Sequence, residues 1–254
     1  MSIASEITRL NNAKAAIKQS LANKGIEVSD SALLDEYPAL IDSIEVGGEG
    51  GDPYYEDLYN LRTSNGTNMT HMFYGCTASS LDLSKFDTSK ATNMMKMFSN
   101  CTSLTELDVS NFDTSKVTDM SFMFHYCSEL TTITGLQNFD FTKAIKLGNM
   151  FGYCDSLTSL DLSTWDVEKF KSPYQFQEII NNCNSLADFY PPKNINTDMK
   201  VDKSPVLSHD SLMRIINNLM TTTSTKKLTL GATNKAKLTD EEIAIATGKG
   251  WTVA

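Results

Sequence analysis

The chain lacks the positive charge that proteins use to hold nucleic acid. It has 22 Lys and Arg residues against 31 Asp and Glu residues, so its formal net charge is −9 at pH 7. This balance argues against binding to nucleic acid or to an anionic membrane surface. No apolar run is long enough to span a bilayer either. We therefore expect no nucleic-acid partner and no membrane insertion.

Targeting and catalytic motifs are also missing. The N-terminal residues, from Met1 to Arg9, lack the basic start and apolar core of a secretory signal. We find no nucleophile elbow, phosphate-binding glycine loop, zinc-protease helix or paired-carboxylate signature. The three histidines are His71, His125 and His209, and we expect the first two on the surface rather than as a ligand pair. The sequence predicts no enzymatic activity, no catalytic residue, no cofactor and no metal site.

What the chain does contain is a repeat of the form Met-Phe-x-x-Cys. The four copies begin at Met72, Met97, Met123 and Met150, and a degraded fifth copy runs from Ile179 to Cys183. Successive cysteines are 25, 26, 27 and 29 residues apart. A nearly constant period in this range is typical of a solenoid, in which each turn buries its apolar face against the next. We therefore predict an α/β repeat solenoid that presents a surface.

Each repeat contains a short segment with the alternation of a half-buried strand. In the clearest unit Leu104, Leu107 and Val109 point inward, and polar residues take the opposite side. A Phe-Asp-Thr-Ser-Lys turn follows, as at Phe86 and Phe112. Solenoids commonly bind partners on the exposed sheet face. The predicted binding residues there are Asp82, Ser84, Glu106, Asp108, Ser110, Asp161 and Ser163. The alternative is that each is merely a solvated strand residue.

The repeated cysteines and methionines have a structural and a functional interpretation. The cysteines are expected to form a reduced, packed ladder, because parallel side chains on adjacent turns suit disulfide geometry poorly. A disulfide or metal site is the alternative, although no Cys-x-x-Cys or nearby His pair offers zinc spacing. The repeated methionines are expected in the core, and an adaptable binding groove is the alternative. These methionines are Met72, Met94, Met97, Met120, Met123 and Met150.

The two ends of the chain differ from the repeats. Residues 1–46 have an amphipathic helical pattern and are the predicted attachment or oligomerisation segment, its apolar positions being Ile3, Ile7, Leu10, Ile17 and Leu21. The Gly-rich stretch 47–53 is typical of a linker, which favours a separate module over a helical cap docked on the repeats. The repeats occupy 54–206.

Residues 207–254 are the predicted C-terminal α/β cap. Ser208 precedes a helical pattern that ends near Leu219, and a short strand is expected from Leu228 to Leu230. Thr239 and Glu242 form a capping box for a further helix, and Trp251 begins a last predicted strand.

Two family resemblances follow from these residues. The unit Leu107-Asp-Val-Ser-Asn-Phe-Asp-Thr-Ser-Lys-Val-Thr-Asp-Met-Ser-Phe-Met-Phe-x-x-Cys127 resembles the BspA-like leucine-rich repeats of bacterial surface proteins, over residues 67–190. That resemblance implies a right-handed leucine-rich-repeat coil with adhesion or protein-binding roles. The third unit departs from it at Ile133–Leu136, and the fifth at Phe189–Pro192. The segments from Ile3 to Leu10 and from Leu40 to Ile44 look like the helical start of bacteriophage tail and fibre proteins.

Together the resemblances imply a bacteriophage or prophage virion structural protein, either a tail or a head fibre or appendage. Such a protein is assembled in the cytoplasm of the bacterial host. Its N-terminal helices would form a homo-oligomer, for which a trimer is one arrangement. Its repeats would bind other virion proteins or a host-surface protein or glycan. The alternatives are a BspA-like adhesin on the bacterial cell surface and an intracellular protein-interaction scaffold.

Overall fold

The computed structural model describes residues 67–254, except residues 85, 167, 169–175 and 177. The predicted N-terminal helical segment (1–46) and linker (47–53) lie outside the described residues. So do the expected attachment residues Ile3, Ile7, Leu10, Ile17 and Leu21.

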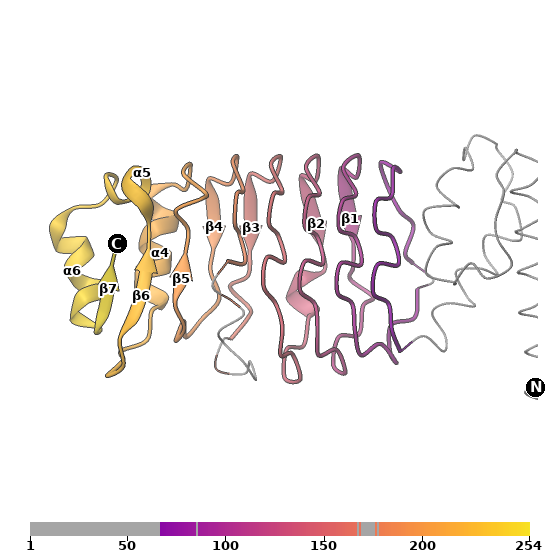
Figure 1. Cartoon of the computed structure of the whole chain (residues 1–254), viewed down its shortest axis with the longest axis horizontal. Helices are drawn as coiled ribbons and strands as arrows, with labels where there is room; N and C mark the ends of the chain where they lie inside the picture. The colour runs from indigo at the N-terminus through magenta and orange to yellow at the C-terminus, as the bar shows by residue number, and fades with distance from the viewer. Residues whose placement is uncertain (1–66, 85, 167, 169–175, 177) are drawn as a thin grey trace, which may run out of the picture.

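From residue 67 the chain forms successive turns that lie side by side along the long axis of the molecule (Figure 1). Parallel bridges join Asn68 to Asn93, Asn93 to Asp119, and Asp119 to Lys146. Other backbone bonds keep the same offset: the Phe98 amide donates to the Met123 carbonyl at 2.9 Å, for example. The repeat length of the sequence is thus also the offset of the inter-turn hydrogen bonds. We call this part, residues 67–200, the stack.

Short parallel strands lie in successive turns of the stack and continue beyond it. They are β1 (Glu106–Asp108), β2 (Thr132–Thr134), β3 (Ser159–Asp161), β4 (Asp188–Tyr190), β5 (Met199–Lys200), β6 (Lys226–Thr229) and β7 (Trp251–Val253). In the described residues they pair as three separate sheets, β1-β2, β3-β4 and β5-β6-β7. The register places Leu107 opposite Ile133 and Leu160 opposite Phe189, so apolar side chains of neighbouring turns meet on one side.

The core of the stack consists of rows of equivalent side chains. Phe73, Phe98, Phe124 and Phe151 are buried, and neighbouring rings stack with centroids 5.2, 5.7 and 5.4 Å apart. The core interpretation of the methionines is confirmed at five of the six expected positions, whereas Met72 is only partly buried. Burial of each such side chain contributes about 1.5–3 kcal/mol, so the rows are the main stabilising feature of the stack.

The cysteines form a further buried row and are free thiols, as the reduced-ladder interpretation expected. The thiol of Cys127 donates to the Phe98 carbonyl at 3.1 Å, and that of Cys154 donates to the Phe124 carbonyl at 3.1 Å. Burial raises the pKa of Cys154 well above its usual range and that of Cys183 to about 12. Because the thiolate is the reactive form, these thiols act as packing groups and hydrogen-bond donors, not as nucleophiles.

The C-terminal segment is helical between its strands. It contains α4 (His209–Asn218), α5 (Gly231–Lys235) and α6 (Asp240–Gly248). Ser208 caps α4, and Thr239 with Glu242 forms the predicted capping box of α6. Helix α5 was not predicted, and β6 begins two residues before the expected strand. Strand β5 precedes residue 207 but pairs with β6, so the sheet continues across the expected domain boundary.

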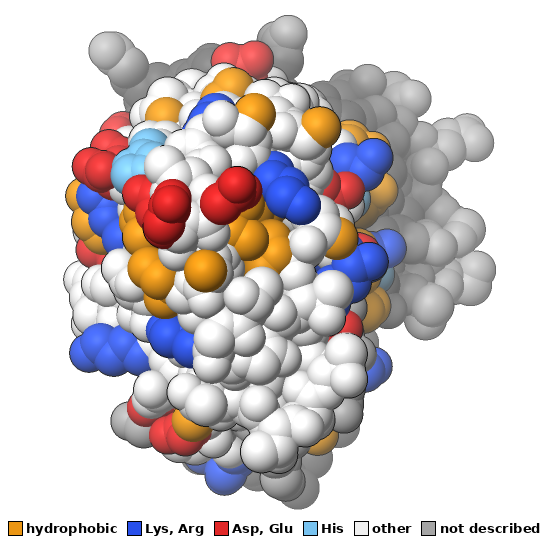
Figure 2. All heavy atoms as spheres, turned by 90° about the vertical axis from the view of Figure 1, so that its left-hand side faces the viewer, with side chains coloured by type: hydrophobic (Ala, Val, Ile, Leu, Met, Phe, Trp, Pro, Cys, Tyr) orange, Lys and Arg blue, Asp and Glu red, His pale blue; other side chains and the backbone are white. Residues whose placement is uncertain are grey.

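Figure 2 shows the C-terminal end of the molecule, where hydrophobic side chains lie among acidic and basic ones. Helix α6 buries Ala246 but leaves Ile245 exposed. None of the helices in the described ranges has the length and apolar content that a bilayer crossing requires.

Candidate binding surface

The predicted binding residues lie along one side of the stack, which we call the strand face. Glu106 and Asp108 are exposed at the ends of β1, on either side of buried Leu107. Asp161 is exposed at the end of β3, beside buried Leu160. Asp82, Ser84 and Ser110 are also exposed, whereas Ser163 is only half-exposed. The strand alternation of the sequence therefore places these side chains on the surface.

The aspartates of the strand face have a second, local role. Asp82, Asp108 and Asp161 each accept a hydrogen bond from the backbone amide two residues later, at 2.9, 2.9 and 2.8 Å. The bond from the Ser110 hydroxyl, followed by the bond from its amide, lowers the pKa of Asp108. These Asx turns hold the carboxylates in fixed positions, so the strand face offers pre-positioned hydrogen-bond acceptors.

The strand face is interrupted between β2 and β3. Nine positions separate Leu130 from Phe139, whereas eight separate both Leu104 from Phe112 and Leu157 from Trp165. The additional residue falls at Gly135, which has a φ of 98° and is followed by a 3-10 turn, Leu136–Asn138. In the described residues β2 pairs with β1 and β3 pairs with β4, but β2 and β3 do not pair.

A hollow of about 130 Å³ opens at this interruption. It is lined by residues of two adjacent turns, namely Ile133, Leu136, Gln137, Leu157, Ser159, Leu160, Asp161 and Thr164. The carbonyl of Leu136, one of the lining residues, accepts a hydrogen bond from the Trp165 indole at 2.9 Å. Pockets for whole small-molecule ligands have volumes of roughly 300–1,000 Å³, so this hollow suits a single side chain or sugar substituent of a larger partner. The lining of the hollow includes Asp161, one of the predicted binding residues of the strand face.

Sequence reasoning did not predict the hollow or the residues that form it. The irregular run from Ile133 to Leu136 was the available signal, because it breaks the Leu-x-Leu pattern of the other turns. The described residues contain no group of three or more His, Cys, Asp or Glu side chains placed to hold a metal ion.

Residues 52–165 and 106–200 both match the family described as Mycoplasma protein of unknown function, DUF285. These overlapping matches span more than half of the 254 residues. The chain belongs to the DUF285 family. No curated protein and no solved structure matches it.

The DUF285 region includes the whole strand face and the hollow, since it extends to residue 200. Helices α4, α5 and α6 lie beyond it. The predicted binding residues therefore lie within the residues that match the family model.

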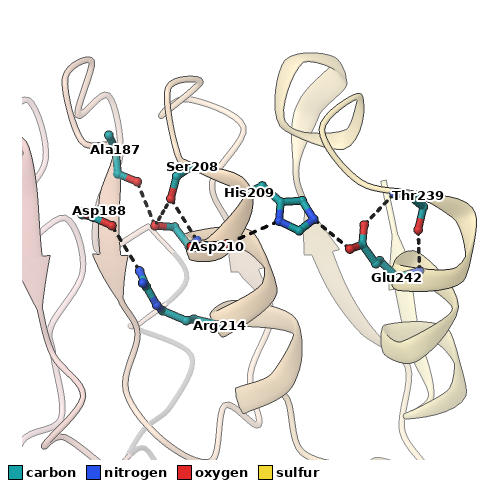
Figure 3. Close-up of polar contacts among 9 residues, drawn as sticks. Ala187, Asp188, Ser208, His209, Asp210, Arg214, Thr239 and Glu242 are labelled. Atoms are coloured by element: carbon teal, nitrogen blue, oxygen red, sulfur yellow. Dashed lines mark hydrogen bonds and ion pairs between the residues drawn. The ribbon is translucent and has the colours of Figure 1, made fainter.

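A polar network joins the C-terminal segment to the DUF285 region (Figure 3). Arg214 of α4 forms an ion pair with Asp188 of β4 at 3.3 Å, and its guanidinium lies 4.0 Å from the centroid of the Tyr190 ring. The Ser211 hydroxyl donates to the Ala187 carbonyl at 2.8 Å and accepts from the Phe189 amide. These four contacts join α4 to β4 and to the residue before it, so they position the helix against this part of the stack.

His209 connects α4 to α6 in the same view. Its Nε2 atom lies 2.8 Å from Glu242 and its Nδ1 atom 3.6 Å from Asp210 (Figure 3). The bond to Glu242 is the main cause that raises the pKa of His209. The pKa of Glu242 is lowered, first by the bond from the Thr239 backbone amide and then by the bond to His209. Because Glu242 also closes the capping box with Thr239, this cluster holds the two helices together rather than facing a cleft.

Proposed function

We propose that this DUF285 protein is a non-enzymatic bacteriophage or prophage virion protein that binds partners through the strand face. In this proposal the stack is a solenoid of the BspA-like leucine-rich-repeat type, and the C-terminal segment covers its end. The N-terminal helical segment assembles the homo-oligomer, and the repeats project from it.

The observation that carries the binding role is the row of fixed carboxylates beside the hollow. Asp108 and Asp161 are held by Asx turns, and Glu106 is exposed two residues before Asp108 on the same side of β1. Pre-positioned groups lose little entropy when a partner binds, which favours affinity on an otherwise shallow surface. The hollow next to Asp161 gives one side chain or sugar substituent of the partner a place to insert.

The virion assignment is supported by the likeness of residues 3–10 and 40–44 to the helical start of tail and fibre proteins. The second candidate is a bacterial surface adhesin with the same repeats. The family description favours it, because it names a protein of the bacterium Mycoplasma. The two candidates differ in what residues 1–46 do: a virion appendage requires self-assembly, whereas the adhesin does not.

Light scattering on the full chain tests the assembly part of the proposal. We expect a homo-oligomer for residues 1–254 and a monomer for residues 52–254, which begin where the family match begins. Two monomers would exclude assembly through the helices and favour the adhesin.

Adsorption of the labelled full chain to bacterial cells tests the binding part. We expect saturable adsorption that unlabelled chain displaces. Adsorption that does not saturate, or its absence on every host tested, would contradict a host-surface role.

A further inference from the structure

A second surface feature lies outside the strand face, on the residue that precedes each cysteine. Backbone bonds align these residues from turn to turn: the Asn100 amide donates to the His125 carbonyl at 2.7 Å, and the Tyr126 amide donates to the Gly152 carbonyl at 2.8 Å. The aligned residues are Gly75, Asn100, Tyr126, Tyr153 and Asn182. All five have a left-handed backbone, with φ values of 73°, 66°, 59°, 60° and 57°. We call them the left-handed row.

Tyrosine is an unexpected residue type in this row. Glycine has no steric cost at positive φ, and asparagine tolerates it better than other residues with side chains. Tyr126 and Tyr153 stand where the neighbouring turns have Asn100 and Asn182. The fold therefore accepts the less strained residues at the same position, and the two tyrosines bring strain that the stack does not require. Such strain is concentrated at functional sites.

The two tyrosines form an aromatic surface with residues of the same turns. Their rings stack with centroids 4.3 Å apart and an interplanar angle of 12°. His125 lies edge-on to both, at 4.5 and 5.4 Å, and Phe122 lies 5.1 Å from His125. Phe122 also has positive φ, at 58°. Tyr126 is 43% exposed, so the group is a surface cluster and not part of the core.

Amide side chains occur in the same turns as the cluster and in the turns on either side. Asn100 and Asn182 occupy the positions at either end of the tyrosine pair. Asn181 lies 3.4 Å from Asn149, and Asn184 donates to Asp155 at 2.7 Å. Burial, and then the charge of Lys96, lower the pKa of His125, so its ring is neutral at pH 7. The surroundings thus offer both donors and acceptors with little net charge.

We propose that this aromatic and amide surface binds a neutral pyranose oligosaccharide. A sugar ring has an apolar C–H face that packs on aromatic side chains and hydroxyl groups that both donate and accept hydrogen bonds. Tyrosine beside asparagine and aspartate supplies both kinds of contact. A proline-rich peptide also packs on aromatic side chains, but it has few donors to use the surrounding amides. This site goes beyond the proposed function and shares no residue with the strand face.

The test is a calorimetric titration of the full chain with cellotetraose, maltotetraose and chitotetraose, each in a separate experiment. We expect one of these sugars to bind at micromolar to millimolar concentration. Tyr126→Asn and Tyr153→Asn, which copy the neighbouring turns, should each weaken binding about tenfold. Tyr126→Phe keeps the ring and should retain most of the affinity. Tyr74→Asn is the matched control, because Tyr74 is equally exposed at 43% but lies outside the row.

Unfolding midpoints of the variants separate a binding defect from a folding defect, and asparagine is expected to be tolerated since it occurs at this position in adjacent turns. The proposal is overturned if none of the three sugars binds, or if folded Tyr126→Asn binds as tightly as the unaltered chain. It is equally overturned if a proline-rich peptide binds at Tyr126 and the sugars do not compete. Asp108→Asn should leave sugar binding unchanged, so failure here is distinguishable from failure of the strand-face proposal.

Discussion

The stack and the C-terminal segment both contain short parallel strands, but different contacts stabilise them. In the stack equivalent side chains repeat from turn to turn, as the stacked phenylalanines and buried thiols show. In the C-terminal segment single polar side chains connect one element to the next. Lys249, for instance, donates to the Ile216 and Asn217 carbonyls at the end of α4. Repeated contacts place stability in the interfaces between turns. Single contacts allow a helix such as α6, with one buried residue, to separate locally.

The largest expected effect is in the middle of the stack. Phe124→Ala removes a fully buried ring that stacks on both neighbouring turns, so the free energy of unfolding should fall by about 3–5 kcal/mol. Phe122→Ala, in the same turn but only partly buried, is the matched control and should cost about 1 kcal/mol or less. Denaturant unfolding measures both. Equal losses would show that the rows do not dominate stability.

A pair of glycine substitutions compares the two regions directly. Gly135→Ala should destabilise the stack by at least about 2 kcal/mol, because φ is 98° and the new Cβ would lie 2.3 Å from the Ser110 amide nitrogen. Gly248→Ala, at the end of α6, meets no atom within 4 Å and should be neutral or slightly stabilising. Thermal unfolding distinguishes them. If Gly135→Ala were tolerated, the interruption of the strand face would not depend on this backbone conformation.

Substitution in the row of buried cysteines is expected to lower the free energy of unfolding by less than the changes above. Cys154→Ala removes the donor to the Phe124 carbonyl and should cost about 1 kcal/mol. Ser128→Ala removes a long, exposed inter-turn bond of 3.4 Å and should cost less. Iodoacetamide labelling of the unaltered chain provides an independent check, because buried thiols should react only after unfolding. Rapid labelling of the native protein would contradict the packed ladder.

The smallest effect belongs to the His209 link. The pKa of His209 is raised in the folded protein. Its stabilisation of the contact between α4 and α6 is therefore complete below the unfolded pKa and is lost as pH rises through the folded pKa. The pKa of Glu242 is lowered in the folded protein, so the stabilisation that Glu242 gives to the same contact is lost as pH falls through its folded pKa. The contact between α4 and α6 should therefore be strongest in mildly acidic solution. His209→Gln should abolish the weakening above pH 6.5, which hydrogen exchange in α6 would detect; an unchanged pH profile would refute the role of His209.

The sequence predicted the repeated features far better than the single ones. A Met-Phe-x-x-Cys motif recurring at every turn predicts a buried row, because the same side chain must meet its equivalent in the next turn. The capping box at Thr239 was also predicted from the sequence, since its two side chains lie within one helical turn of each other. The hollow was not predicted, because the broken Leu-x-Leu pattern near Gly135 does not reveal that β2 and β3 fail to pair. Helix α5 was missed because its five residues have no hydrophobic period.

The candidate surfaces follow the same division. Exposure of Glu106 and Asp108 could be predicted from strand alternation, but the Asx turn that fixes Asp108 could not be assigned without coordinates. The left-handed row was overlooked because Tyr126 and Tyr153 are unremarkable until the φ values of Gly75, Asn100 and Asn182 are compared with theirs.

The most direct test of the central claim, that the strand face binds the partner, compares two sets of charge-removing substitutions in the full chain. Asp108→Asn with Asp161→Asn removes strand-face charge but keeps an acceptor for each Asx turn. Asp87→Asn with Asp113→Asn makes the same change at Asx turns of the Phe-Asp-Thr-Ser-Lys corner and is the matched control. Adsorption to host cells is measured for both. We predict at least about a tenfold loss of affinity for the first pair and none for the second. Equal affinities, with both proteins folded, would contradict the assignment.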